Sequence, residues 1–275
     1  MKRSYLPLLA AAILSSAATA TAQTLTKVWE TEPVLTTCES ALYYHTGDYI
    51  FVSNIVGNPA EADGVGFISK VSTEGKVLEL KWVEGLDAPK GLAISDGKLY
   101  VADLDDLVEI DLATGKILKR YPVKDAVFLN DVAAYAGKVY VSDTRTGKVH
   151  VLKKGKISLF ADDREGVNGL QFRNGKLYAL DNLGFRQYPL DGSAPEMVSD
   201  GVKGGDGLVA LTGDTWVASH WSGEVFLVQG SKATQMLDTR EQGLNTADIG
   251  YIPAERLVLV PTFAGNTVAA YRLEY

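Results

Sequence analysis

The sequence contains little of what the common zinc and thiol enzymes use. Its 275 residues include 1 Cys and 3 His, and His45, His150 and His220 lie far apart in the chain. A single Cys can neither close an internal disulfide nor build a Cys-rich zinc site, and the histidines form no HxH or HExxH pair. These scarcities disfavour the usual zinc centres and Cys/His catalytic pairs. Cys38 is therefore expected to be a small buried residue and not a nucleophile.

Positive charge is scarce as well. Lys and Arg number 27 against 34 Asp and Glu, which gives a formal net charge of −7 at pH 7. No basic run offsets this balance, so the electrostatic footprint of a nucleic-acid-binding protein is missing. The composition, 46% hydrophobic and 22% charged, is that of a globular chain and not of a disordered one. We therefore expect a folded protein with no nucleic-acid partner.

Long apolar runs are lacking, and the main one is a short stretch at the start. Two basic residues at Lys2-Arg3 precede an apolar run that ends at Leu14, and Ala20-Thr21-Ala22 forms an A-x-A cleavage site. The run is far shorter than the roughly 20 residues that span a bilayer. This layout predicts a signal peptide over residues 1–22, cleaved before Gln23. We expect export to the periplasm or the medium, with no membrane anchor.

Residues 23–275 are dominated by strand-like alternation and by a repeated unit. Each unit has a strand, a Gly-containing tight turn and a second strand, as in Asn168-Gly169-Leu170 followed by Gly175. A second hairpin follows in each unit. The units begin at positions 39, 90, 130, 168, 206 and 247, in steps of 51, 40, 38, 38 and 41 residues. A period near 40 residues with four strands is typical of propeller blades. We predict an all-β, single-domain six-bladed β-propeller of four-stranded antiparallel blades.

The ends of the chain predict how the ring closes. The last unit has room for three strands only, at Ala247–Ile252, Leu257–Pro261 and Thr267–Leu273. The missing outer strand is expected from Thr26–Glu30, which would leave no open edge in the ring. The first two units start 51 residues apart, further than the others, which predicts an insertion around Asn58–Gly64 that covers one face of the ring.

The residues that open the inner strands form a polar column. The first strand of a blade is the innermost, so these six residues are expected to converge on the central channel. They are Glu39, Lys90, Asn130, Asn168, Asp206 and Ala247. Four carry hard oxygen donors, so we expect a divalent cation, Ca²⁺ first, with Mg²⁺, Mn²⁺ and Zn²⁺ as alternatives. Singly, Asn and Asp before a strand are plain turn formers. As a set they favour a site, because buried polar groups need partners.

A second column of carboxylates ends the second strands of three units. It consists of Asp103, Asp143 and Asp181. Asp side chains at strand ends commonly accept hydrogen bonds from loop N–H groups. We therefore interpret this column as structural.

The units resemble those of the senescence-marker-protein/gluconolactonase family, the regucalcin-like six-bladed propellers. The matching motifs are Cys38-Glu39-Ser40-Ala41, Asn168-Gly169-Leu170, and Asp206-Gly207 followed by Trp216-Val217-Ala218. The resemblance implies that Glu39, Asn168 and Asp206 ligate a divalent metal and that Asp206 is the general base. Asn130-Asp131 matches a pair at the family's site, and Asn130 is assigned to orienting the substrate as a second catalytic residue.

Two positions depart from the family pattern. Phe128 replaces an Arg that the sugar-lactone members carry two residues before the Asn that corresponds to Asn130. Lys90 places a positive charge on the ring of column residues. Both are assigned to substrate binding together with Asn130. Phe128 predicts a preference for apolar or small lactones. Lys90 either stabilises the product carboxylate or is a counter-charge to the acidic ligands.

The resemblance implies a metal-dependent hydrolase that opens a small-molecule lactone or a related ester, acting as an exported monomer. The alternative is a non-catalytic propeller that binds a small molecule, a glycan or a peptide, and Phe128 and Lys90 favour it. A quinone-dependent sugar dehydrogenase is a third possibility on a propeller fold. That chemistry would need a His base and several Arg near the axis, and the column contains neither.

Overall fold

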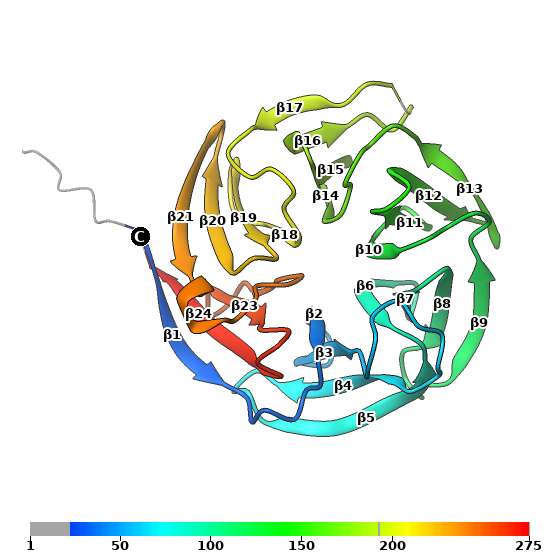
Figure 1. Cartoon of the computed structure of the whole chain (residues 1–275), viewed down its shortest axis with the longest axis horizontal. Coiled ribbons are helices and arrows are strands. Elements are labelled where there is room, and N and C mark those ends of the chain that lie inside the picture. Colours follow the sequence, from blue (N-terminus) through cyan, green and yellow to red (C-terminus); the bar gives the residue numbers. More distant parts are fainter. Residues whose placement is uncertain (1–22, 192, 275) are drawn as a thin grey trace, which may run out of the picture.

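The computed structural model describes residues 23–191 and 193–274, which form a ring of six sheets around a central channel (Figure 1). Each sheet consists of four antiparallel strands, so the predicted fold class is confirmed. Within these residues no helix has the length and apolar character needed to cross a membrane. The predicted signal peptide, residues 1–22, lies outside the described residues.

Within each of the first five blades the strands follow one another outward from the channel. A short 3-10 helix, η1 (Arg240–Gln242), follows the fifth blade. From inner to outer strand, the first blade consists of β2 (Cys38–Tyr44), β3 (Tyr49–Asn54), β4 (Gly66–Ser72) and β5 (Val77–Leu86), and the second of β6 (Pro89–Ser95), β7 (Lys98–Asp103), β8 (Asp106–Asp111) and β9 (Ile117–Pro122). The third consists of β10 (Leu129–Tyr135), β11 (Lys138–Asp143), β12 (Lys148–Lys153) and β13 (Lys156–Ala161), and the fourth of β14 (Leu170–Arg173), β15 (Lys176–Asp181), β16 (Gly184–Tyr188) and β17 (Glu196–Ser199). The fifth consists of β18 (Leu208–Ala210), β19 (Thr215–His220), β20 (Glu224–Gln229) and β21 (Lys232–Asp238).

The sixth blade joins the two ends of the chain. Its inner strands are β22 (Gly250–Ile252), β23 (Leu257–Pro261) and β24 (Val268–Glu274), and its outer strand is β1 (Thr24–Glu30). β1 pairs antiparallel with β24, from Thr24 opposite Glu274 to Glu30 opposite Ala269. The predicted closure by the N-terminal strand is therefore confirmed, and the ring has no open end (Figure 1).

Tight turns between β-strands follow directly from the sequence. The turn at Asn174-Gly175 joins β14 to β15, and both residues have positive φ, 49° and 74°. Two successive positive φ values define the type I′ turn, whose twist matches that of the flanking strands. Asp96-Gly97 repeats this arrangement between β6 and β7. These turns explain why the repeat could be recognised from glycine positions alone.

The hydrophobic core of the described residues is divided into seven clusters, and the six larger ones each lie between two neighbouring blades. In one of them Leu180 and Phe185 of the fourth blade pack against Trp216 of the fifth. The rings of Phe185 and Trp216 meet edge to face with centroids 5.1 Å apart. Because each blade contributes apolar side chains to both neighbours, the sheets are held face to face around the channel.

Glycines just before the inner strands permit neighbouring blades to come unusually close. A Cβ at Gly169 would lie 2.2 Å from the carbonyl oxygen of Asp206, and one at Gly207 would lie 2.3 Å from the amide nitrogen of Ile249. Neither glycine has a φ in the left-handed region. Close approach therefore explains these glycines better than turn formation does. The residues just before them are consequently drawn together around the channel.

Candidate functional site

The residues predicted from the sequence surround one cavity at the start of the inner strands. Its volume is about 230 Å³. Its lining consists of Glu39, Ile55, Pro59, Lys90, Phe128, Asn130, Asn168, Asp206, Trp221 and Phe263. Every residue assigned above to metal binding, catalysis or substrate binding lies in this set. The repeat therefore brings together side chains that are far apart in the chain.

The inner strands place the polar lining residues at equivalent positions. Glu39, Lys90 and Asn130 lie near the starts of β2, β6 and β10. Asn168 and Asp206 lie two residues before β14 and β18, and the amide nitrogens of both donate to carbonyls of the second strand, at 2.9 Å and 2.8 Å. These backbone hydrogen bonds fix the side chains on rigid elements and not on mobile loops.

Two oxygen-bearing side chains in this cavity are incompletely satisfied. The Asn168 Nδ2 group donates to Asp206 Oδ1 at 2.7 Å, which leaves Asn168 Oδ1 without a donor. Glu39 Oε2 is likewise buried without a hydrogen-bond partner. Buried polar atoms of this kind require a bound partner. In the described part of the chain no three His, Cys, Asp or Glu side chains are grouped to hold a metal, so a cation here would need the Asn168 amide oxygen as well.

Burial makes both acidic groups of the cavity difficult to ionise. The exposed fractions of Glu39 and Asp206 are 4% and 3%. Burial, reinforced by the neighbouring carboxylates of Asp206 and Asp248, holds the pKa of Glu39 well above its ordinary value. Burial, with a smaller contribution from the Asp248 carboxylate, raises the pKa of Asp206 to about 7, although the hydrogen bond from Asn168 acts to lower it. A bound cation would relieve this repulsion.

Lys90 enters the cavity without forming an ion pair among the described residues. Its side chain is buried, and Nζ donates to the carbonyl oxygens of Ala88 at 2.9 Å and Pro59 at 3.4 Å. Burial lowers the pKa of Lys90 to about 8, although Glu39 acts in the opposite direction. Lys90 is thus a desolvated cation beside the acidic pair, not a salt-bridge partner of either acid.

Asn130 and Phe128 are positioned by the strand that follows them. The Asn130 Nδ2 group donates to Thr144 Oγ1 at 3.2 Å. The backbone N–H groups of Val127 and Phe128 both donate to the Asp143 carboxylate at 3.0 Å. Asp143 therefore holds the loop that carries the Phe128 ring into the cavity.

The second column of carboxylates is structural, as predicted. Asp103, Asp143 and Asp181 are fully buried, and each accepts hydrogen bonds from loop N–H groups. Asp103 and Asp181 also form ion pairs with Arg120 and Arg186. The column fixes the loops that border the cavity and does not itself line it.

The apolar walls of the cavity come from loops. Pro59 belongs to the insertion between β3 and β4, so the predicted insertion does border this face. Trp221 and Phe263 lie edge to face with centroids 5.6 Å apart, and Trp221 is 49% exposed at the rim. The cavity thus combines a polar floor with an aromatic rim, an arrangement that suits a ligand with both a polar and an apolar part.

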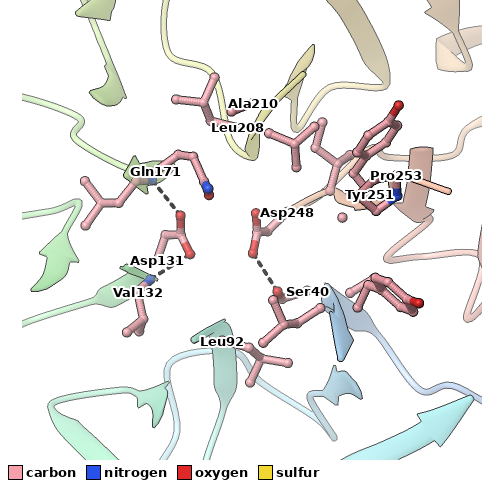
Figure 2. Close-up of a pocket in the computed structure, with 17 residues that line it drawn as sticks. Ser40, Leu92, Asp131, Val132, Gln171, Leu208, Ala210, Asp248, Tyr251 and Pro253 are labelled. Carbon is pink, nitrogen blue, oxygen red and sulfur yellow. Dashed lines mark hydrogen bonds between the residues drawn. The ribbon is translucent and has the colours of Figure 1, made fainter. Parts of the chain in front are cut away.

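A second pair of carboxylates lies one residue further along the inner strands. Asp131 and Asp248 face each other across the channel (Figure 2), beside a separate cavity of about 220 Å³. Asp131 accepts from the amide nitrogens of Val132 and Leu170, each at 2.6 Å, and Asp248 accepts from Ser40 Oγ at 2.5 Å. The Asn130-Asp131 pair is therefore divided, because only Asn130 lines the first cavity.

Asp248 went unrecognised because the sixth unit was aligned on Ala247. Asp248 follows that position by one residue, as Asp131 follows Asn130. The repeat therefore places Asp248 at the position equivalent to Asp131. Asp248 is 9% exposed, and burial raises its pKa to about 7. Its carboxyl group influences both acids of the first cavity.

Replacing Asp248 with Asn is expected to stabilise the protein at pH 8 and to change little near pH 4. Because the native pKa is raised, the native state holds a proton that the unfolded chain releases above about pH 4. Wild-type stability therefore falls as pH rises toward 7, whereas Asn stays neutral and still accepts from Ser40. Thermal melts in chelator should show a gain on the order of 1–2 kcal/mol at pH 8. A loss at pH 8 would contradict the raised pKa.

These observations define a six-bladed β-propeller with an oxygen-rich cavity at its centre. No protein-family profile and no characterised protein sequence matches the chain. Catalytically inactive virginiamycin B lyase from Staphylococcus aureus, solved with quinupristin, is similar in fold, with a TM-score of 0.64, 11% identity, and coverage of 92% of this chain and 100% of that one. Its selenomethionine form has a TM-score of 0.62 at 11% identity, with the same coverage. Chaetomium thermophilum Raptor has a TM-score of 0.59 at 10% identity and covers 86% of this chain and 24% of Raptor. Similarity at this level supports the fold alone.

Proposed function

We propose that this protein is a divalent-cation-dependent hydrolase that opens a lactone or a related ester in the cavity at the start of the inner strands. Glu39, Asn168 and Asp206 would hold the cation, with Ca²⁺ as the first expectation. The observation that carries the proposal is the presence of two buried oxygen atoms without partners, Glu39 Oε2 and Asn168 Oδ1, beside the Asp206 carboxylate.

The donor set fits a hard cation. Two carboxylates balance a divalent charge, and the amide supplies a neutral oxygen of the type that Ca²⁺ accepts. The hydrogen bond from Asn168 Nδ2 to Asp206 Oδ1 orients the amide so that its oxygen is the free end. Such a cation, when bound, polarises a substrate carbonyl and stabilises negative charge on its oxygen.

The other polar residues of the cavity supply the remaining roles. Asp206 accepts a proton from the attacking water, whose oxygen bonds to the carbonyl carbon as the ring C–O bond breaks and the leaving oxygen takes up a proton. Asn130 orients the substrate through its amide, and the Lys90 ammonium stabilises the carboxylate product.

Lactone turnover by the purified protein is expected to disappear with chelator and to return with added Ca²⁺. Loss of the cation removes the charge that stabilises the developing oxyanion, so the rate should fall at least about 100-fold. The measurement is hydrolysis of a panel of γ- and δ-lactones and aryl esters, with and without chelator. Turnover that chelator leaves unchanged would contradict the proposal.

The second candidate is a non-catalytic propeller that uses the same cavity to bind a ligand. The aromatic rim of Trp221, Phe263 and Phe128 favours it, because that surface binds an apolar group without any chemistry. Ca²⁺ binding with no turnover of any lactone or ester would select this candidate. For both candidates we propose export by the predicted signal peptide, to the periplasm or the medium, and action as a monomer on a small molecule.

A further inference from the structure

A cavity separate from the central one lies where the second and third blades meet. Its volume is about 340 Å³. Its polar lining consists of Lys124 and Asp125, which follow the outer strand β9, and of Lys148 and His150 in β12. β9 and β13 are the outer strands of the two blades (Figure 1). No residue lines both this cavity and the central one, so a ligand here would be independent of the proposed hydrolase.

His150 is a buried side chain with an unsatisfied ring nitrogen. It is 6% exposed, and its Nε2 atom is buried without a hydrogen-bond partner among the described residues. His150 lies two residues after Lys148, so both side chains lie on the same side of β12. That side faces the second blade, because Leu152, two residues further on, packs with Leu107 of β8. A buried ring nitrogen of this kind requires a bound partner.

The groups around His150 favour an anion over a cation. Lys124 and Lys148 line the same cavity, and neither forms an ion pair within the described part of the chain. Burial lowers the pKa of His150, and the Lys148 ammonium acts in the same direction. Asp143 and Asp162 oppose this shift without reversing it. The neutral ring keeps one N–H donor, and with the two ammonium groups it can serve the oxygens of an anion.

Asp125 determines which anion fits. Its carboxylate lines the same cavity and forms no ion pair among residues 23–191 and 193–274. Sulfate has only acceptor oxygens at neutral pH, so this carboxylate would repel it. Phosphate keeps a proton, which it donates to the carboxylate while its other oxygens accept hydrogen bonds from the lysines and the histidine. The mixture of three donors and one acid therefore suits phosphate better than sulfate.

We propose that this cavity binds a phosphate group that retains a proton. His150, Lys124 and Lys148 donate to its oxygens, and Asp125 accepts from its hydroxyl. Binding supplies the partner that the His150 Nε2 atom lacks and neutralises the two lysines.

Free phosphate and a phosphate monoester share this chemistry. The cavity also has an apolar part, formed by Pro122, Ile157 and Leu159, and the Leu159 side chain is 54% exposed. An organic group attached to the phosphate would contact this part, so the affinity for an aryl phosphate distinguishes the two sources.

Isothermal calorimetry with sodium phosphate and sodium sulfate at pH 6, both in chelator, tests the site without any turnover. The wild type should bind one phosphate per chain, about 10-fold or more tightly than sulfate. His150→Leu keeps an apolar side chain at the buried position, and Lys148→Met keeps the aliphatic stem. Each should weaken phosphate binding about 10-fold or more, the loss of a hydrogen bond to a charged group. The matched control is Lys153→Met, which removes the same charge from an exposed end of β12 outside the cavity.

Two further titrations define the ligand. Asp125→Asn should bind sulfate more tightly than the wild type does, because the repelling charge is gone, and Asn tolerates the φ of 61° at this position. Phenyl phosphate bound more tightly than inorganic phosphate would identify an organic phosphate as the ligand, whereas equal or weaker binding would identify free phosphate.

The proposal would be overturned by a wild-type protein that binds no phosphate or binds sulfate equally well. It would also be overturned if His150→Leu and Lys148→Met both bound phosphate as tightly as Lys153→Met does. A melting temperature for each variant shows that it is folded, and the two substitutions test the site separately.

Discussion

Asp206→Ala is expected to abolish both Ca²⁺ binding and lactone turnover. The variant loses one of only two acidic groups in the cavity, and it also removes the hydrogen bond that orients the Asn168 amide. We expect the calcium affinity to fall by at least about 100-fold, since loss of one partner from a buried charged cluster costs about 3 kcal/mol or more. Isothermal calorimetry with CaCl₂ measures this change.

Two further variants make the result specific. Asp214→Ala removes an exposed carboxylate from the same blade and should bind Ca²⁺ as the wild type does. Asp206→Asn keeps an oxygen ligand but cannot accept a proton at neutral pH, so it should retain part of the affinity while losing turnover. Full stoichiometric binding by Asp206→Ala would show that this carboxylate is not a ligand.

Deleting residues 23–31 should greatly lower the thermal stability. The deletion removes β1, exposes the whole edge of β24, and takes Trp29 and Leu25 away from two inter-blade clusters. An exposed strand edge of this length also promotes association between chains. We expect the melting temperature to fall by about 10 °C or more and the protein to aggregate on heating, as followed by circular dichroism and light scattering.

Val28→Thr is the control for this deletion, because Val28 lies in β1 with its side chain 42% exposed. It keeps every backbone hydrogen bond of the strand, and its melting temperature should stay within a few degrees of the wild-type value. If the deletion melts as the control does, β1 is not needed to close the ring.

The repeat explains why so much of the fold and cavity could be predicted. In a propeller, equal positions in successive units occupy equal heights along the channel, so a column in the sequence becomes a ring in space. Glu39, Asn168 and Asp206 were found this way, and they do line one cavity. The closing strand was predicted by counting, because a sixth blade of three strands lacks a partner at its edge.

Asp248 was missed although it lies at a repeated position, because that position is one residue beyond the column of strand-opening residues. The sixth unit also lacks the glycine that follows Asn168 and Asp206, so it matched those units less closely. The close approach of neighbouring blades at Gly169 and Gly207 is shown only by the inter-blade distances.

A crystal structure of the protein grown with CaCl₂ would locate the proposed cation. We expect one cation per chain in the central cavity, with oxygens of Glu39, Asn168 and Asp206 at about 2.3–2.6 Å from it. Cation density elsewhere, or a cavity in which these three side chains hold no cation at saturating calcium, would contradict it.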